Sequence, residues 1–244
     1  MIPAENEVAR ALATPSDIPV RVALRSAVIL AIFTAISTLL LAVSHTLTRP
    51  VMEASLRAKR MRAIEEILPH GIYDNDLVSD VLRLDADPSS ALNVPSVFYR
   101  GRRNGAPAVL VVETSARGGY GGPIGLLIGI RADGTLLGVR VTEHRETPGL
   151  GDYIDPKKDK NRKNPWIAQF GGLSFGARPE SEWKVRKDGG SFDFIAGATV
   201  SPRAIVRAVR DTLKFVAERH ETLYGVPEKD PVTALSHSSQ GDTP

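Results

Sequence analysis

A short segment near the C-terminal end holds the residues best suited to carry a chemical group, Asp193-Phe-Ile-Ala-Gly-Ala-Thr-Val-Ser-Pro202. The Thr199 hydroxyl could be joined as an ester to a phosphate-linked group. Gly197 and Ala198 have almost no side chain, so a bulky group or a modifying enzyme could approach the backbone closely. A Gly-Ala-Thr-x-Ser pattern is a weak signal taken alone, and an ordinary capped loop explains it as well.

The residues that follow predict the start of a helix. Ser201 is suited to cap it, because its hydroxyl can accept a hydrogen bond from an unpaired N–H group, and Pro202 suits the first turn. The free N–H groups and the positive end of the helix dipole would then face a phosphate at Thr199. Apolar residues recur at three- and four-residue steps and predict one buried side, formed by Ile205, Val209, Leu213 and Val216.

Two glycine-rich segments, residues 118–124 and 144–151, could bring the backbone close to a flat ligand. Neither has the spacing of a Rossmann or P-loop nucleotide site, and turns with unusual φ angles explain both equally well. His144 and Glu146 alternate at a strand end, but they form an incomplete ligand set, so no metal site is expected. The basic loop, residues 157–163, could attract an anionic cofactor or an acidic partner, or be a solvated run of charges.

An apolar run without charges, residues 26–48, predicts a membrane span. At about 1.5 Å of rise per residue it reaches about 34 Å, which matches the hydrocarbon core of a bilayer. A cleaved signal peptide is the alternative, but the run and the segment before it are longer than such a peptide needs. Residues 51–68 predict an amphipathic helix that links the membrane to the domain and ends at Pro69. A membrane tether makes nucleic acid an unsuitable partner.

The overall composition is that of one ordinary domain behind a membrane anchor, with 42% hydrophobic residues and a net charge of +3 over 244 residues. Fewer positive charges precede the span than follow it closely, so the positive-inside rule alone would leave the large domain in the cytoplasm. The absence of cysteine excludes a cysteine-ligated iron–sulfur cluster, a c-type haem site and a catalytic thiol in this chain.

The middle of the chain alternates with a period of two and predicts an antiparallel sheet. Asn104-Gly105 and Asp133-Gly134 are turn residues that tolerate positive φ, and they join residues 97–100 with 109–114 and 124–130 with 136–142 as hairpins. A short helix over 166–170 with Asn164 as its cap, and a long helix over 202–224, follow the sheet. The predicted fold class is therefore α+β, with one N-terminal transmembrane helix and flanking helices around the sheet.

Four motifs stand in series, and together they indicate a family. They are Gly119-Tyr-Gly-Gly-Pro-Ile124, Glu146-Thr-Pro-Gly-Leu-Gly-Asp152, Trp183-x-Val-x-Lys-Asp-Gly-Gly190 and the threonine segment that ends at Pro202. With the anchor in front, this order resembles the G component of the Rnf ion-translocating electron-transport complex, from the span to the terminal helix. The C component of sodium-pumping quinone reductases shares chiefly the threonine motif and remains the more distant alternative.

The resemblance implies a covalent cofactor. In this family a flavin transferase that draws on FAD and magnesium esterifies the phosphate of FMN onto a threonine, here Thr199. The resemblance further places Gly197 and Ala198 around the phosphate link, Thr147 and Leu150 beside the ring system, and Lys187 as a charge partner of the flavin.

It also implies an electron-carrier subunit of a redox-driven ion translocase, with the other membrane and peripheral subunits of an Rnf-type complex as partners. The chain would lie in the bacterial inner membrane with its C-terminal domain in the periplasm, despite the charge count, and would supply no catalytic residue of its own. A non-redox membrane-tethered binding module and a free-standing flavoprotein reductase are the other classes kept open. The expected division is a cytoplasmic segment 1–25, the span 26–48, a helix and connector 49–95, an FMN-binding domain 96–224 and a disordered tail 225–244.

Overall fold

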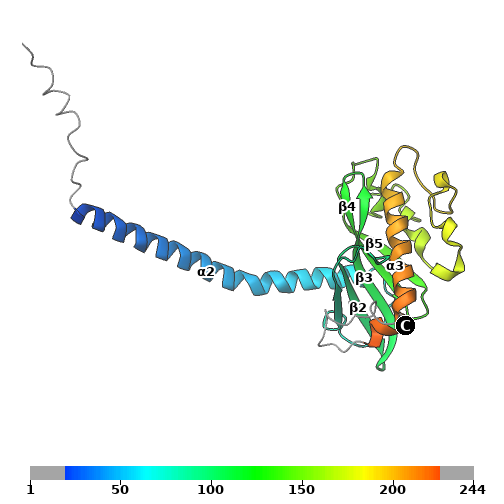
Figure 1. Cartoon of the computed structure of the whole chain (residues 1–244), viewed down its shortest axis with the longest axis horizontal. Coiled ribbons are helices and arrows are strands. Elements are labelled where there is room, and N and C mark those ends of the chain that lie inside the picture. The colour runs from blue at the N-terminus through cyan, green and yellow to red at the C-terminus, as the bar shows by residue number, and fades with distance from the viewer. Residues whose placement is uncertain (1–19, 226–244) are drawn as a thin grey trace, which may run out of the picture. The chain divides into compact units, whose positions relative to one another are not determined.

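The computed structural model describes residues 20–225, so most of the predicted N-terminal segment and the tail beyond Gly225 lie outside the described residues. Its first element is the long helix α2 (Val20–Glu65) (Figure 1). Within it, Val22–Arg49 contains an 18-residue stretch with a mean hydropathy of 2.5 and is long and apolar enough to cross a membrane. Packing divides the chain between Leu56 and Arg57, so this apolar stretch belongs to a unit separate from the sheet domain.

The sequence predicted two helices on either side of Pro50, and the structure has one. The helical backbone continues through Pro50 and ends at Glu65, before the predicted end at Leu68. The chain then leaves the helix through a turn in which the N–H groups of Ile67 and Leu68 both donate to the Ile64 carbonyl, at 3.0 and 3.1 Å. Proline removes a bond from the helical ladder at a cost of about 3 kcal/mol, and here that loss does not end the helix.

The described part of the chain contains one antiparallel sheet, in which each strand pairs with the next along the sequence. This arrangement confirms the α+β class and both predicted hairpins. The first strand was not predicted, because four residues are too few to show a period. The strands are β1 (Val81–Leu84), β2 (Ser96–Arg103), β3 (Ala106–Gly119), β4 (Gly122–Arg131) and β5 (Leu136–Glu143).

The two hairpin turns differ in length. Asn104 and Gly105 both have positive φ, 51° and 78°, as a two-residue type I′ loop requires. In the second turn only Gly134 has positive φ, 84°, and the Arg131 N–H donates to the Thr135 carbonyl at 2.8 Å. The second connection is therefore wider than the two-residue loop that Asp133-Gly134 suggested.

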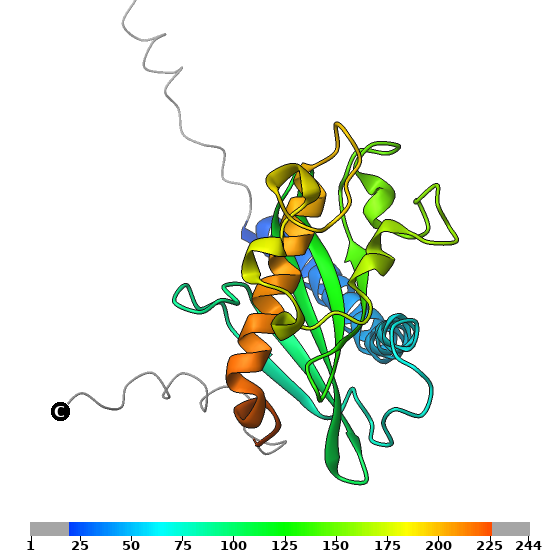
Figure 2. The same ribbon diagram turned by 90° about the vertical axis from the view of Figure 1, so that its right-hand side faces the viewer.

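Alternate residues of the central strands face two separate cores, as the period of two requires. Helix α3 (Val200–Gly225) lies across one face of the sheet (Figure 2), and its predicted apolar stripe is buried there. The end of α2 covers part of the opposite face. Leu110 and Val112 share the first core with Val209 of α3, while Val109 and Val111 share the second with Ile64 of α2.

The chain between β5 and α3 contains five short 3-10 helices and a row of packed aromatic rings. Trp166 and Phe170 pack edge to face at 5.6 Å between ring centroids, and Phe170 stacks on Phe192 at 4.9 Å. The short helix over 166–170 is confirmed, but its cap by Asn164 is wrong. The five helices are η1 (Asp152–Ile154), η2 (Trp166–Phe170), η3 (Phe175–Ala177), η4 (Glu180–Glu182) and η5 (Arg186–Asp188).

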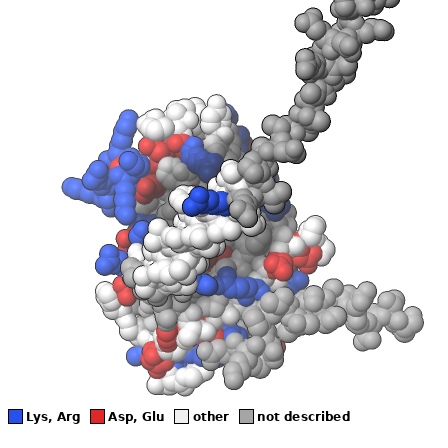
Figure 3. Space-filling view, turned by 90° about the vertical axis from the view of Figure 1, so that its left-hand side faces the viewer, with Lys and Arg blue, Asp and Glu red and all other residues white. Residues whose placement is uncertain are grey.

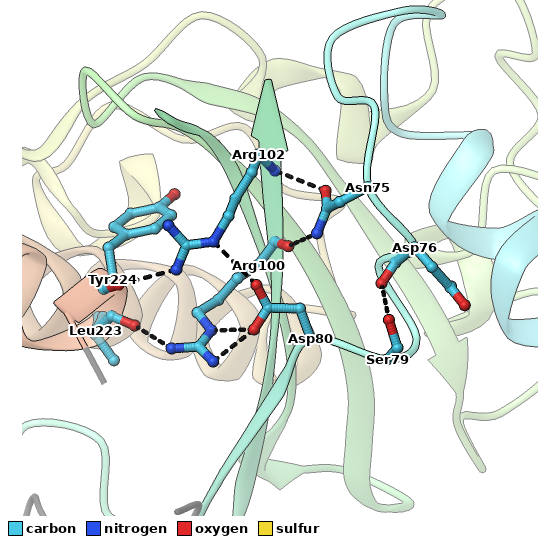
Figure 4. A network of polar contacts seen from close by, with 8 residues as sticks. All are labelled: Asn75, Asp76, Ser79, Asp80, Arg100, Arg102, Leu223 and Tyr224. Carbon is cyan, nitrogen blue, oxygen red and sulfur yellow. Dashed lines mark hydrogen bonds and ion pairs between the residues drawn. The ribbon is translucent and has the colours of Figure 1, made fainter. Parts of the chain in front are cut away.

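A buried ion cluster joins β2 to the last turn of α3 (Figure 4). Arg100 is only 1% exposed, and its Nε donates to Asp80 Oδ1 at 2.7 Å while its Nη1 donates to the Leu223 carbonyl at 3.3 Å. Arg102 donates to Asp80 Oδ2 at 3.1 Å and to the Tyr224 carbonyl at 2.9 Å. Because cations are favoured at the last carbonyls of a helix, this cluster fixes the C-terminal end of α3 against the sheet.

Candidate functional site

Thr199 is the residue immediately before helix α3, and it is largely buried, with 8% of its surface exposed. Its carbonyl accepts a hydrogen bond from the Arg203 N–H at 3.2 Å, which begins the helix. The Thr199 hydroxyl forms no hydrogen bond with any group of residues 20–225. The predicted cap by Ser201 is wrong, because Ser201 lies inside the first turn and its hydroxyl is used elsewhere. Because the Thr199 hydroxyl has no hydrogen-bond partner among residues 20–225, it is available for reaction.

The two residues before Thr199 are held in a tight turn. The Ala198 N–H donates to the Ile195 carbonyl at 3.0 Å, and Gly197 has a φ of 85°. A positive φ at this third position defines a type II turn and explains why a glycine stands there. The Tyr153 hydroxyl binds both ends of the turn, because it donates to the Ala198 carbonyl at 3.0 Å and accepts from the Ile195 N–H at 3.2 Å.

The beginning of the same loop is held from the opposite side. The indole N–H of Trp166 donates to the Asp193 carbonyl at 2.6 Å, and the Gln169 side chain accepts from the Asp193 N–H at 2.9 Å. Asp159 in turn accepts from the Trp166 N–H at 2.6 Å, which is the contact that replaces the predicted Asn164 cap. Hydrogen bonds from residues of η1 and η2 therefore fix both ends of the loop that carries Thr199. Sequence analysis missed Tyr153 and Trp166, whose only local signal is an aromatic ring among glycines and charges.

Burial raises the pKa of Tyr153 to about 12, although the hydrogen bond from Ile195 acts in the opposite direction. The folded state thus favours the neutral phenol. The resulting contribution to the free energy of unfolding is complete below pH 10 and is lost as the pH rises through 12. The expected loss is up to about 3 kcal/mol. We predict that the free energy of unfolding falls more steeply between pH 10 and 12 in the native protein than in Tyr153→Phe.

Urea unfolding at a series of pH values measures this difference. Tyr99 and Tyr224 also have raised pKa values, because both are buried, but they are present in both proteins and cancel in the comparison. Parallel alkaline slopes in the two proteins would show that Tyr153 is already accessible in the folded state.

Glu146 connects three segments around the Thr199 loop. Its carboxylate is buried, accepts the Ser201 hydroxyl at 2.5 Å through Oε2 and accepts the Gly121 N–H at 3.2 Å through Oε1. A side-chain carbon at Gly151 would lie 2.9 Å from Oε2, and one at Gly119 would lie 2.8 Å from Oε1. The glycines that we associated with a flat ligand thus allow their backbones to approach Glu146. This carboxylate joins the β3–β4 turn, the loop after β5 and the first turn of α3.

The His144 imidazole does not contact this carboxylate, since its Nδ1 accepts the Glu146 backbone N–H at 3.2 Å. Within residues 20–225, no group of three or more histidine, aspartate or glutamate side chains is arranged to hold a metal ion. One local hydrogen bond joins His144 to the Glu146 backbone, while the Glu146 carboxylate binds the more distant Gly121 and Ser201. The pairing of Glu146 with Ser201 could not be found from the sequence, because fifty-five positions separate the two residues.

Glu146→Gln is expected to destabilise the domain by about 1–3 kcal/mol. The amide oxygen of glutamine could still accept the Gly121 N–H, with the amide nitrogen turned toward Ser201. The Ser201 hydroxyl would then accept from this nitrogen instead of donating to a carboxylate, so a charge-assisted hydrogen bond is lost and the buried hydroxyl proton loses its acceptor. Glu143→Gln is the matched control, because Glu143 is exposed near the same strand end. Chemical unfolding of the three proteins measures the effect, and equal midpoints for both variants would contradict it.

Exposed apolar side chains gather on the segments that surround Thr199. In the sheet unit, from residue 57 to 225, the large hydrophobic residues that are strongly exposed are Tyr120, Leu150, Ile195 and Val200. Tyr120 directly precedes Gly121, whose N–H binds Glu146. Leu150 directly precedes Gly151, which packs beside Ser201 in the first turn of α3. Ile195 and Val200 lie at the two ends of the Thr199 turn. Thr147 is exposed, and its carbonyl accepts the Leu150 N–H at 3.1 Å. A flat apolar group attached at Thr199 would find these surfaces beside it.

Two cationic features lie on segments bound to the same loop. Lys187 is exposed on η5, and the neighbouring Asp188 forms a two-point ion pair with Arg203 of α3 at 2.5 Å. The residues of the basic loop, 157–163, are exposed apart from the buried Asp159, whose Oδ1 also accepts the Asn161 N–H at 2.8 Å. Figure 3 shows lysine and arginine side chains gathered at one edge of the face that it draws.

Two family models match the chain over these regions. The model of the FMN-binding domain matches residues 119–214, which include the glycine-rich segments, the Thr199 loop and most of α3. The model of the RnfG N-terminal region matches residues 19–67, which cover α2. The fold and the site therefore define a membrane-anchored protein with an FMN-binding domain.

Curated relatives make the family specific. The G component of the ion-translocating oxidoreductase complex of Pseudomonas aeruginosa is 40% identical over 205 residues, which are 84% of this chain and 94% of the relative. The protein of the same name from Vibrio atlanticus is 36% identical over 83% of this chain and 94% of the relative. That from Photorhabdus laumondii is 38% identical over 84% and 97%. The chain belongs to the RnfG family, the G components of ion-translocating oxidoreductase complexes.

Proposed function

We propose that this chain carries FMN covalently on Thr199 and passes electrons between partner subunits of an Rnf-type complex that drives ion transport. The observation that carries the proposal is the Thr199 hydroxyl, which no group of the described chain occupies, at the start of α3 inside the region matched by the FMN-binding domain. The relatives are named as subunits of an ion-translocating oxidoreductase complex, which supports the role in the whole assembly.

The residues present fit this cofactor. The turn at Gly197 and Ala198 leaves open space beside the attachment point, since nothing lies within 4 Å of a side-chain carbon at Gly197. The N–H groups at the start of α3 favour a phosphate there, and Leu150 with the other exposed apolar side chains offers a surface for the ring system. Thr147 and Lys187 complete the proposed surroundings. FMN would supply the electron transfer, while the chain sets its exposure and hydrogen bonding.

We propose attachment by a flavin transferase with FAD as donor and magnesium as cofactor. The Thr199 oxygen forms a bond to the phosphorus of the FMN half of FAD, the pyrophosphate bond breaks, and AMP leaves. The proton of the hydroxyl passes to a base of the transferase or to solvent. The buried Glu146 is committed to Ser201 and Gly121, so this chain supplies structure for the step and the transferase supplies the catalytic groups.

We place the sheet domain in the periplasm and α2 in the bacterial inner membrane. The support is the family, in which the domain is expected to be exported, and the apolar stretch Val22–Arg49 of α2. A periplasmic carrier gains from a covalent ester, because the cofactor cannot dissociate between cycles of reduction. The unfavourable charge count would then be overcome by partner subunits and the export machinery.

Intact-mass analysis of the natively matured chain tests the proposal, together with in-gel flavin fluorescence after denaturation. A mass increase equal to an FMN ester and a fluorescent band are expected. Colourless protein of bare polypeptide mass, from a host that has the transferase, would instead favour a non-redox binding module. Turnover of a soluble acceptor by the isolated chain would favour a free-standing reductase.

A further inference from the structure

A cavity lies between α3 and the segment that contains η4 and η5, and its lining is strongly basic. It has a volume of about 300 Å³ and is lined by Lys184, Arg203, Arg207 and Arg210 with a single carboxylate, Asp188. Residues 203, 207 and 210 follow the three- and four-residue steps of a helix, so their side chains share one side of α3. We call this hollow the α3 cavity.

The carboxylates nearby do not neutralise these cations. Asp188 pairs with Arg203 at 2.5 Å, and Asp211, outside the lining, pairs with Arg210 at 2.7 Å. The side chains of Lys184 and Arg207 have no hydrogen-bond or ion-pair partner within residues 20–225. Arg203 and Arg210 each keep N–H donors that their carboxylate does not use. Together with the two unpaired side chains, they leave the cavity with an excess of positive charge.

The wall opposite α3 is fixed rather than loosely solvated. Trp183 and Val185 are buried at 1% and 0% exposure on either side of Lys184, so the lysine side chain alone is directed out of this segment. The Phe192 N–H donates to the Lys184 carbonyl at 3.1 Å, and the Gly190 backbone lies so close that a side-chain carbon there would be 2.1 Å from the same oxygen. The indole nitrogen of Trp183 is buried without a partner among the described residues.

We propose that the α3 cavity binds a phosphate-type oxyanion, either free phosphate or the phosphate of a lipid headgroup. Arginine guanidinium groups present planar pairs of donors that match phosphate oxygens, and a lysine adds a compact charge. An anion would be held between Arg207 on α3 and Lys184 on the opposite wall, where neither cation has another hydrogen-bond or ion-pair partner among the described residues. This site is separate from the Thr199 hydroxyl and does not depend on the proposed flavin.

Calorimetric titration of the full chain in neutral detergent with inorganic phosphate tests the site, at constant ionic strength adjusted with chloride. Saturable binding is expected, and Arg207→Gln or Lys184→Gln should weaken it about 10- to 100-fold, the effect of losing a charge-assisted hydrogen bond. Both side chains are exposed and unpaired within residues 20–225, so neither variant should unfold the domain. Arg186→Gln is the control, because Arg186 lies two positions after Lys184 on the same segment, pairs with Asp193 and does not line the cavity.

The same titration in the Thr199→Ala protein separates this proposal from the flavin. Equal phosphate affinity with and without flavin supports an independent site, whereas binding confined to Thr199→Ala would mean that the FMN phosphate occupies it and would overturn the proposal. A second arm adds phosphatidylglycerol to the micelles. Displacement of phosphate by this lipid identifies a headgroup as the ligand, and no displacement identifies the free ion. Absence of saturable binding of either ligand, or equal binding by Arg207→Gln, would also refute the site.

Discussion

Thr199→Ala, expressed beside the transferase, is expected to yield a colourless chain with the mass of the bare polypeptide. The substitution removes the one oxygen that we propose as the ester atom, so the loss of covalent flavin should be complete rather than partial. The fold should be retained, because the Thr199 hydroxyl makes no hydrogen bond within residues 20–225 and only a methyl group and this hydroxyl are lost. Mass spectrometry and in-gel fluorescence give the flavin content, and chemical unfolding gives the stability.

Two controls make the result specific to this hydroxyl. Thr199→Ser keeps an oxygen at the same position and should retain covalent flavin. Thr147→Ala removes an exposed threonine hydroxyl from the neighbouring loop and should leave the ester intact. Ser201→Ala is a weak control, because Ser201 donates to the buried Glu146 and its loss would disturb the first turn of α3. Flavin retained on Thr199→Ala would move the attachment to another residue.

Arg100→Met should destabilise the sheet domain by about 3–5 kcal/mol. Arg100 is buried and donates to Asp80 and to the Leu223 carbonyl, so its removal leaves the buried carboxylate paired with Arg102 and the Leu223 carbonyl without this donor. Because domains are stable by only about 5–15 kcal/mol, this loss is a large share of the total. Urea unfolding followed by near-ultraviolet circular dichroism measures it.

Arg83→Met is the matched control, since Arg83 is exposed on the neighbouring strand β1. It should change the free energy of unfolding by no more than about 0.5 kcal/mol. The double variant Asp80→Leu with Arg100→Met removes the buried carboxylate together with the buried guanidinium and should be less destabilised than Arg100→Met alone. Arg102 also loses Asp80 in this variant, but its side chain is partly exposed and still donates to the Tyr224 carbonyl. If the single and double variants lose the same stability, the cost comes from packing and not from the carboxylate.

Local patterns were sufficient for the parts of the fold that neighbouring residues dictate. The turn at Asn104-Gly105 could be predicted because positive φ at two successive positions selects such residues, and the stripe on α3 because its spacing matches one side of a helix. The turn at Asp133-Gly134 was found but its width was not, since only Gly134 adopts the left-handed conformation. The continuation of α2 through Pro50 was missed, because the uncharged run ends at Thr48 and the amphipathic pattern begins at Val51, so the sequence divides one helix into two patterns.

The candidate site divides in the same way. A threonine after two small residues, an apolar run of bilayer length and the order of four motifs are properties of the linear chain, and they were enough to indicate a membrane-anchored flavoprotein family. The contacts of Glu146 with Ser201, of Tyr153 with the Thr199 turn and of Arg100 with the end of α3 join residues 42 to 123 positions apart. Which distant partners meet depends on how the helix and the sheet pack together, and burial then requires each polar group to find a partner. For that reason the roles of these buried polar residues became visible in the folded chain.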